Sequence, residues 1–358
     1  MPNNKYIQAA GKTTSFLTQH VLRRRPALAY VGGWLGEQNL GDELLFDATE
    51  VLFNHGLWHF NGGALSNRLY GMAPRRAGGI LGGGTLIGQL PKWLNIAKSF
   101  QVHGDPFAVI GTGVADPHFW PDGTPLSEWK PVLNSCPLVG VRGPMSAEYL
   151  TDAGIENVDV VGDPAVVFTR DEPNSNFEQG VLALNFGRAH ERMWGTAENV
   201  RDEMAKLATL AKNAGWKVVW LVVFPGDLEI TMEAAEVSHT TEHVEIIYHD
   251  YNHFMDVVGK ASVMVGMKLH ATILATCALT PSIMLEYRQK CRDYMQSIDH
   301  DEYVITTGDF LADPCWERIQ EMDRERMTLS RKLEKEMRAL KSKLIKSASL
   351  AENIFHST

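Results

Sequence analysis

The sequence has few cysteines, no long apolar run and no excess of basic residues, and each shortage excludes a class of protein. Its four cysteines, Cys136, Cys277, Cys291 and Cys315, lack the Cys-x-x-Cys spacing of zinc sites and redox motifs, which predicts reduced, buried thiols. No stretch approaches the roughly 18 to 20 apolar residues of a membrane-spanning helix. Residues 1–25 contain no apolar core of a secretory signal. We therefore expect a soluble, cytoplasmic protein.

Charge and histidine spacing exclude two further classes. The net charge is -9, and no block dense in Lys or Arg lies beside aromatic residues, so nucleic acid is not an expected partner. Two histidine pairs have metal-ligand spacing, His239 with His243 and His249 with His253, but no Glu completes an H-E-x-x-H motif. The sequence predicts no metal site.

Apolar runs alternate with amphipathic stretches along the 358 residues, and this pattern is typical of strand–helix units around parallel sheets. The predicted fold is α/β, with two Rossmann-like domains and a long C-terminal helix. A polar segment at residues 170–179 is the expected linker. We place the N-terminal domain at residues 1–172, the C-terminal domain at 173–310 and the helix at 311–358.

The C-terminal helix has an apolar stripe that includes Leu333, Met337, Leu340 and Leu344, beside a basic face. Three interpretations fit this pattern. The stripe packs on the body of the protein, it forms a contact between copies in a homo-oligomer, or the helix lies on an anionic membrane as a peripheral contact.

The segment Ser262 to Ala275 holds the main candidates for chemistry. A strand is expected to end at Gly266 and a helix to begin two or three residues later, so Lys268 and His270 lie at the carboxyl edge of a sheet, where open α/β folds bind ligands. Helix N-termini favour anions, Lys268 adds a full positive charge, and His270 can exchange a proton near neutral pH. A capping or packing role for His270 is the alternative.

Glycine-rich strand ends occur at several places in the first half of the chain. One precedes Asn39, Asp42 and Glu43, and another contains Gly83, Gly84 and Thr85. None of them matches a P-loop or the G-x-G-x-x-G dinucleotide motif. Each is either an ordinary tight turn or part of the lining of a cleft.

Two charged residues follow later strands. Arg142 lies just before Pro144, at an expected helix start, and Asp163 ends the next strand. Arg142 is either a surface charge or a clamp for an anion, and the simplest interpretation of Asp163 is a turn residue.

Taken in order, these segments resemble the polysaccharide pyruvyltransferase family over about residues 27–300. The matching segments are GGWLGEQNLGDE, the GGG loop, GVRGPMSAEYL, VVGDPAVVF, GMKLHATILA and PSIMLEYRQKCRDYM. The resemblance implies a fold like that of the GT-B glycosyltransferases. It also implies phosphoenolpyruvate as donor, and a pyruvate ketal on a sugar of a surface or exported polysaccharide as product.

The resemblance also implies roles for individual residues. The family's Arg-Leu-His element falls on Lys268, Leu269 and His270, so this chain has a point charge where the family has a two-pronged guanidinium. Arg142 and Arg188 are candidates to supply the missing fork, and Lys290 matches the final motif. His270 is the expected general acid. The residues expected on the acceptor side or lining the cleft are Asn39, Asp42, Glu43, Gly83, Gly84, Thr85 and Asp163.

The expected reaction uses phosphoenolpyruvate as a co-substrate and needs no cofactor. The saccharide acceptor, whether free, polymeric or lipid-linked, is not identified by the sequence. Two alternatives stay open: a GT-B glycosyltransferase that uses a nucleotide sugar, and a non-catalytic member of a polysaccharide assembly complex that has lost the arginine.

Overall fold

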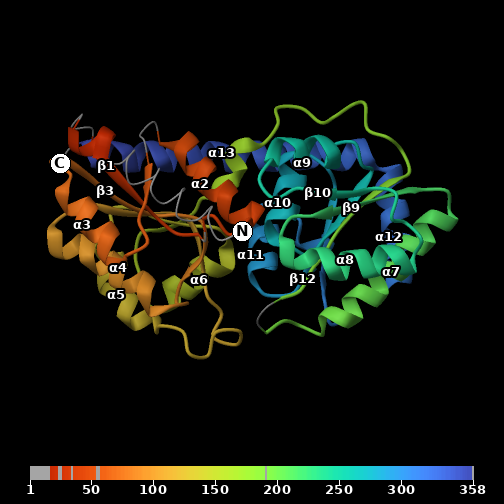
Figure 1. The fold of residues 1–358 in the computed structure, drawn as a ribbon, viewed down its shortest axis with the longest axis horizontal. Helices are drawn as coiled ribbons and strands as arrows, with labels where there is room; N and C mark the ends of the chain where they lie inside the picture. The colour runs from red at the N-terminus through yellow and green to blue at the C-terminus, as the bar shows by residue number, and fades with distance from the viewer. Residues whose placement is uncertain (1–16, 23–25, 34, 54–56, 190–191, 357–358) are drawn as a thin grey trace. The chain divides into compact units, whose positions relative to one another are not determined.

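The computed structural model describes residues 17–22, 26–33, 35–53, 57–189 and 192–356 and divides the chain into two compact units (Figure 1). Unit 1 comprises residues Met1–Gly36, Leu45–Pro164 and Lys343–Thr358. Unit 2 comprises Glu37–Leu44 and Ala165–Ser342. The prediction that no signal sequence is present concerns residues 1–25, of which the structure describes only 17–22. Trp34 of the first motif also lies outside the described residues.

The described part of unit 1 contains a parallel sheet in the order β2-β1-β3-β5-β6-β7, with β4 paired to β5. Helices connect the strands (Figure 1). The strands are β1 (Ala27–Val31), β2 (Leu57–His59), β3 (Arg76–Leu81), β4 (Gly84–Ile87), β5 (Phe107–Val114), β6 (Val139–Val141) and β7 (Val158–Val160). The helices are α3 (Ala64–Met72), α4 (Pro91–His103), α5 (Leu126–Ser135), α6 (Pro144–Asp152) and α2 (Leu40–Leu52) from Leu45 onward.

Unit 2 contains a second parallel sheet, in the order β10-β9-β8-β11-β12-β13. Its strands are β8 (Val181–Asn185), β9 (Lys217–Val222), β10 (Val244–Ile246), β11 (Val263–Gly266), β12 (Ser282–Glu286) and β13 (Val304–Thr306). Its helices are α7 (Ala197–Asn213), α8 (Leu228–Val237), α9 (Tyr251–Val258), α10 (Leu269–Cys277), α11 (Lys290–Ser297), α12 (Ala312–Arg324) and the first part of α13 (Arg326–His356).

The central strands of both sheets are apolar because they are covered on both faces. Every residue of β1, β8, β11 and β12 is buried, which is the pattern of a parallel strand between two layers of helices. The two parallel sheets with connecting helices confirm the α/β architecture predicted from the alternation of apolar and amphipathic segments.

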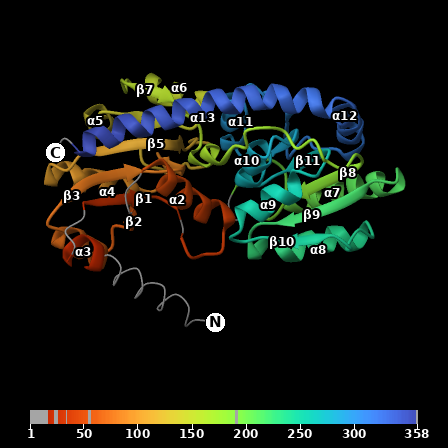
Figure 2. The same ribbon diagram turned by 90° about the horizontal axis from the view of Figure 1, so that it is seen from above.

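The C-terminal region is helical as expected, with a break at Glu325 between α12 and α13 (Figure 2). Leu333, Met337, Leu340 and Leu344 of α13 are all buried, so the apolar stripe packs on the protein. Residues up to Ser342 belong to unit 2, and the helix continues in unit 1.

The unit boundaries differ from the sequence-based ones in two respects. The main change of unit comes at Ala165, a few residues before the boundary placed after residue 172. In addition, the short segment Glu37–Leu44 belongs to unit 2 although it lies early in the chain. Its backbone is tied there, because the Leu40 N–H donates to the Val223 carbonyl at 3.1 Å.

The four cysteine side chains are buried, in agreement with the sequence-based expectation. Burial raises the pKa of the Cys291 thiol to about 11, so this thiol is protonated and unreactive near neutral pH. Among the described residues, no helix has both the length and the hydrophobicity that a membrane crossing requires.

A buried histidine in unit 2 makes stability depend on pH. His300 is 5% exposed, its Nδ1–H donates to the Ile298 carbonyl at 2.7 Å, and burial lowers its pKa below 6.5. The unfolded chain therefore takes up a proton more readily than the folded one, and stability is lost as pH falls through about 6.5. We expect the melting temperature of the wild type to fall more between pH 7.5 and 5.5 than that of His300→Asn. Equal slopes in thermal melts would contradict this expectation.

Candidate active site

The order of strands in unit 2 creates a position where ligands bind in many α/β folds. The chain passes from β8 to β9 on one side, whereas β11 and the strands after it lie on the other side. The carboxyl ends of β8 and β11 therefore lie at the switch point of the sheet, which is where open α/β folds bind ligands. Asn185, at the end of β8, joins the segments around this point by two hydrogen bonds. Its Oδ1 accepts from the Lys268 N–H at 3.1 Å, and its Nδ2 donates to the Leu221 carbonyl at 2.8 Å.

Lys268 caps the N-terminus of α10 and lies at this switch point, as the sequence predicted. Its side chain is 20% exposed and its ammonium group lies 3.0 Å from Oδ1 of Asp227. The ammonium also donates to the Arg188 carbonyl at 2.9 Å. Asp227 was not among the sequence-based candidates, yet it is fully buried and offsets the charge of Lys268.

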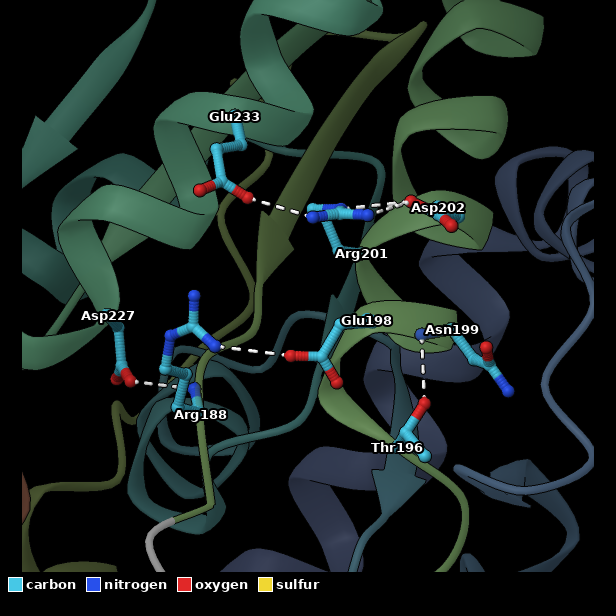
Figure 3. Close-up of polar contacts among 8 residues, drawn as sticks. All are labelled: Arg188, Thr196, Glu198, Asn199, Arg201, Asp202, Asp227 and Glu233. Atoms are coloured by element: carbon cyan, nitrogen blue, oxygen red, sulfur yellow. Dashed lines mark hydrogen bonds and ion pairs between the residues drawn. The ribbon is translucent and has the colours of Figure 1, made fainter.

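The loop after β8 comes close to the Asp227 carboxylate (Figure 3). The Arg188 N–H donates to Asp227 Oδ1 at 3.0 Å. A Cβ added to Gly187 would lie 2.1 Å from the carboxylate, so only glycine allows the backbone to approach so closely. The Arg188 guanidinium points to Glu198, at 3.2 Å, in an exposed ion pair of the kind that contributes about 0 to 1 kcal/mol. Such a weak pair leaves Arg188 able to turn toward an anion.

His270 lies in the first turn of α10 and packs against the first glycine-rich motif. A Cβ on Gly41 would lie 2.1 Å from Nδ1 of His270, so the Gly41 backbone rests directly on the imidazole. Asn39 holds this backbone in place by accepting from the Gly41 N–H at 3.1 Å, the arrangement of a helix N-cap. Two motifs far apart in the sequence, NLGDE and KLH, therefore form one site.

The other residues near the start of these helices have clear structural places. The Leu269 side chain is buried, so only its backbone N–H can face a ligand, together with the other N–H groups of the first turn of α10. Asp42 and Glu43 are half-buried in the first turn of α2, where carboxylates are favourable next to the positive end of the helix.

Cationic side chains surround Tyr287 after β12. The ammonium of Lys290 lies 4.9 Å from the centre of the Tyr287 ring, and the guanidinium of Arg288 lies 5.4 Å from it. Burial raises the pKa of Tyr287, while the nearby charges of Lys268 and Arg288 oppose this rise. Lys290 and Arg288 therefore both lie next to Tyr287, whose pKa also responds to the charge of Lys268.

The remaining candidates belong to unit 1. Arg142 is fully buried, and its guanidinium donates at 3.4 Å to the Gly84 carbonyl and at 3.4 Å to Oγ1 of Thr85. Gly83 and Asp163 are also buried. Arg142 thus packs against the glycine-rich segment at the start of β4. Its hydrogen bonds bring together three of the candidates within unit 1, Arg142, Gly84 and Thr85.

Two of the residues that build the site in unit 2 were not singled out from the sequence. Asp227 follows the apolar strand β9 in a Pro-Gly-Asp turn, and Asn185 ends β8. Their positions at strand ends were detectable, but their partners were not. Among the described residues, no group of three or more His, Cys, Asp or Glu side chains is placed to hold a metal ion.

Comparison with known proteins gives one family and one fold. The model of the family described as polysaccharide pyruvyl transferase matches residues 39–289. A search of curated proteins finds no match. Among solved structures, a UDP-glucosyltransferase from Polygonum tinctorium capable of glucosylating indoxyl has a TM-score of 0.55 at 11% identity, over 93% of this chain and 99% of that one.

Two further structures have the same fold. A putative UDP-N-acetylglucosamine 2-epimerase from Listeria monocytogenes has a TM-score of 0.56 at 10% identity, over 85% of this chain and 90% of that one. HepE from Anabaena, in complex with UDP and glucose, has a TM-score of 0.53 at 10% identity, over 93% of this chain and 100% of that one. At such identities the likeness concerns the fold alone, and it confirms the GT-B fold predicted from the sequence.

Proposed function

The chain belongs to the polysaccharide pyruvyl transferase family, and we propose that it transfers pyruvate from phosphoenolpyruvate to a saccharide. The product is a pyruvate ketal on a sugar of a surface or exported polysaccharide, or of its lipid-linked precursor, and phosphate is released. The observation that carries this proposal is the position of two residues at the switch point of the sheet in unit 2. Lys268 is the N-cap residue of α10, and His270 lies in the first turn of this helix.

The residue types suit an anionic donor. Phosphoenolpyruvate carries a carboxylate and a phosphate, and the first-turn N–H groups of α10 favour such groups. Lys268, Arg188 and Lys290 add full charges in the same unit. Arg142 is fully buried within unit 1, and a part for it in binding the donor stays a prediction.

The reaction needs one proton donor and two sugar hydroxyls. In our proposal, protonated His270 gives a proton to the methylene carbon of the donor, which makes the neighbouring carbon electrophilic. One hydroxyl attacks that carbon and loses its proton, phosphate leaves, and the second hydroxyl closes the ring with loss of its own proton. One of the two released protons restores His270, and the other leaves with the phosphate as hydrogen phosphate. Asp42 and Glu43 follow the glycine that packs on His270 and are candidates for the base.

Release of phosphate tests the proposal. With phosphoenolpyruvate and a suitable saccharide we expect one phosphate per ketal formed, and no phosphate when the acceptor is omitted. In the rival arm, a UDP-sugar is offered with the same acceptors, and a glycosyltransferase would release UDP. Release of UDP without any reaction of phosphoenolpyruvate would establish a glycosyltransferase instead. Turnover of neither donor would favour a non-catalytic role.

A further inference from the structure

The ammonium group of Lys268 is held by two protein acceptors in a fixed geometry. A lysine ammonium has three N–H bonds. One points to Asp227 Oδ1 at 3.0 Å and a second to the Arg188 carbonyl at 2.9 Å. The ammonium also lies 5.8 Å from the centre of the Phe224 ring. Because the side chain is 20% exposed, part of the ammonium group remains accessible to a ligand.

The partner of Lys268 is the Asp227 carboxylate, and burying a carboxylate costs free energy of folding. Asp227 is fully buried, and a buried carboxylate is stable only when it is paired and hydrogen-bonded. Its Oδ1 receives the Lys268 ammonium and the Arg188 N–H, each at 3.0 Å. Gly187 occupies a position where an added Cβ would lie 2.1 Å from the carboxylate. Two separate segments, the loop at residues 187–188 and the turn at Lys268, therefore meet one oxygen atom of Asp227 beside the switch point.

We propose that Asp227 is a positioning residue, which fixes the ammonium group of Lys268 so that its remaining N–H bond points to the anionic donor. An arginine has a rigid planar fork, whereas a lysine is a point charge on a flexible stem. Anchoring the stem at two acceptors supplies the orientation that the lysine lacks by itself. This inference rests on the proposed function, because the donor it concerns is phosphoenolpyruvate.

Replacement of Asp227 by asparagine separates this role from a purely structural one. The amide oxygen can still accept from Lys268 and Arg188, so Asp227→Asn is expected to fold. The loss of a negative charge leaves Lys268 with its full positive charge but a looser position. We expect KM for phosphoenolpyruvate to fall about 3- to 10-fold through Coulomb attraction, and kcat to fall about 10- to 100-fold through misplacement.

Lys268→Met alone is a poor test, because it leaves the Asp227 carboxylate buried without its ammonium partner and is expected to lower the melting temperature. The double variant Asp227→Asn/Lys268→Met removes both charges and should regain much of that loss. Its kcat/KM should be no lower than that of Lys268→Met, since both changes remove the same interaction. Glu198→Gln is the matched control, because it neutralises an exposed carboxylate that contacts the same loop.

Steady-state kinetics, calorimetric binding of phosphoenolpyruvate and thermal melts decide the matter. If the wild type binds and converts phosphoenolpyruvate while Asp227→Asn keeps wild-type KM and kcat, the positioning role is wrong and the proposed function stands. If KM and kcat change no more than in Glu198→Gln, the positioning role is equally wrong. If the wild type neither binds nor converts phosphoenolpyruvate, the proposed function fails and this inference fails with it.

Discussion

Replacing His270 by alanine is expected to lower kcat for pyruvyl transfer by about 10²- to 10⁴-fold, the usual contribution of a general acid. The imidazole lies in the first turn of α10, beside Lys268, and the Gly41 backbone packs on it. No other proton donor is assigned to the methylene carbon in our proposal. Phosphate release at saturating phosphoenolpyruvate measures the loss.

Two controls distinguish loss of the proton donor from loss of packing. His270→Asn keeps a polar side chain beside Gly41 but cannot act as an acid near neutral pH, so its kcat should be as low as that of the alanine variant. His243→Ala removes an exposed histidine from the same unit and should leave kcat unchanged. A kcat for His270→Asn close to that of the wild type would mean that His270 is a packing residue.

The second large effect is expected from Gly41→Ala, although the change is a single methyl group in a helix. The added Cβ would lie 2.1 Å from Nδ1 of His270, so the imidazole or the helix start must move. A displacement of about 1 Å at a catalytic group can cost 10²-fold in rate. We therefore expect kcat to fall about 10- to 100-fold, measured by phosphate release.

Gly71→Ala is the matched control for this prediction. Gly71 lies in α3, and a Cβ there would meet nothing within 4 Å. This variant should stabilise the protein by about 0.5 to 1 kcal/mol, since alanine favours a helix more than glycine does, and it should leave kcat unchanged. If Gly41→Ala acts through His270, adding it to His270→Ala lowers kcat little further. Full additivity of the two losses would contradict that mechanism.

The periodicity of the sequence was sufficient to predict the architecture. Strands such as β8, β11 and β12 are mostly apolar because they are buried on both faces, and the segments between them show helical periodicity. Since the position of a strand end follows from the same pattern, the residues around Lys268 were enough to place this lysine at the carboxyl edge of a sheet.

The interpretation of the C-terminal helix shows where the pattern stops being informative. Its apolar stripe and basic face are compatible with packing, with self-association and with a membrane surface. Only the tertiary structure shows that Leu333 and Met337 are fully buried against the protein. A hydrophobic face must be covered, but its sequence does not identify what covers it.

The sequence by itself determined the alternation of strands and helices around parallel sheets, because local periodicity and strand-end chemistry are encoded within a few residues of each position. The tertiary structure alone decided which charges meet. It placed the Asp227 carboxylate 3.0 Å from Lys268, and it seated the Gly41 backbone on His270. It also enclosed Arg142 within unit 1. Such contacts depend on the spatial order of the strands and on the space left where glycine has no side chain. Neither can be derived from the spacing of residues along the chain.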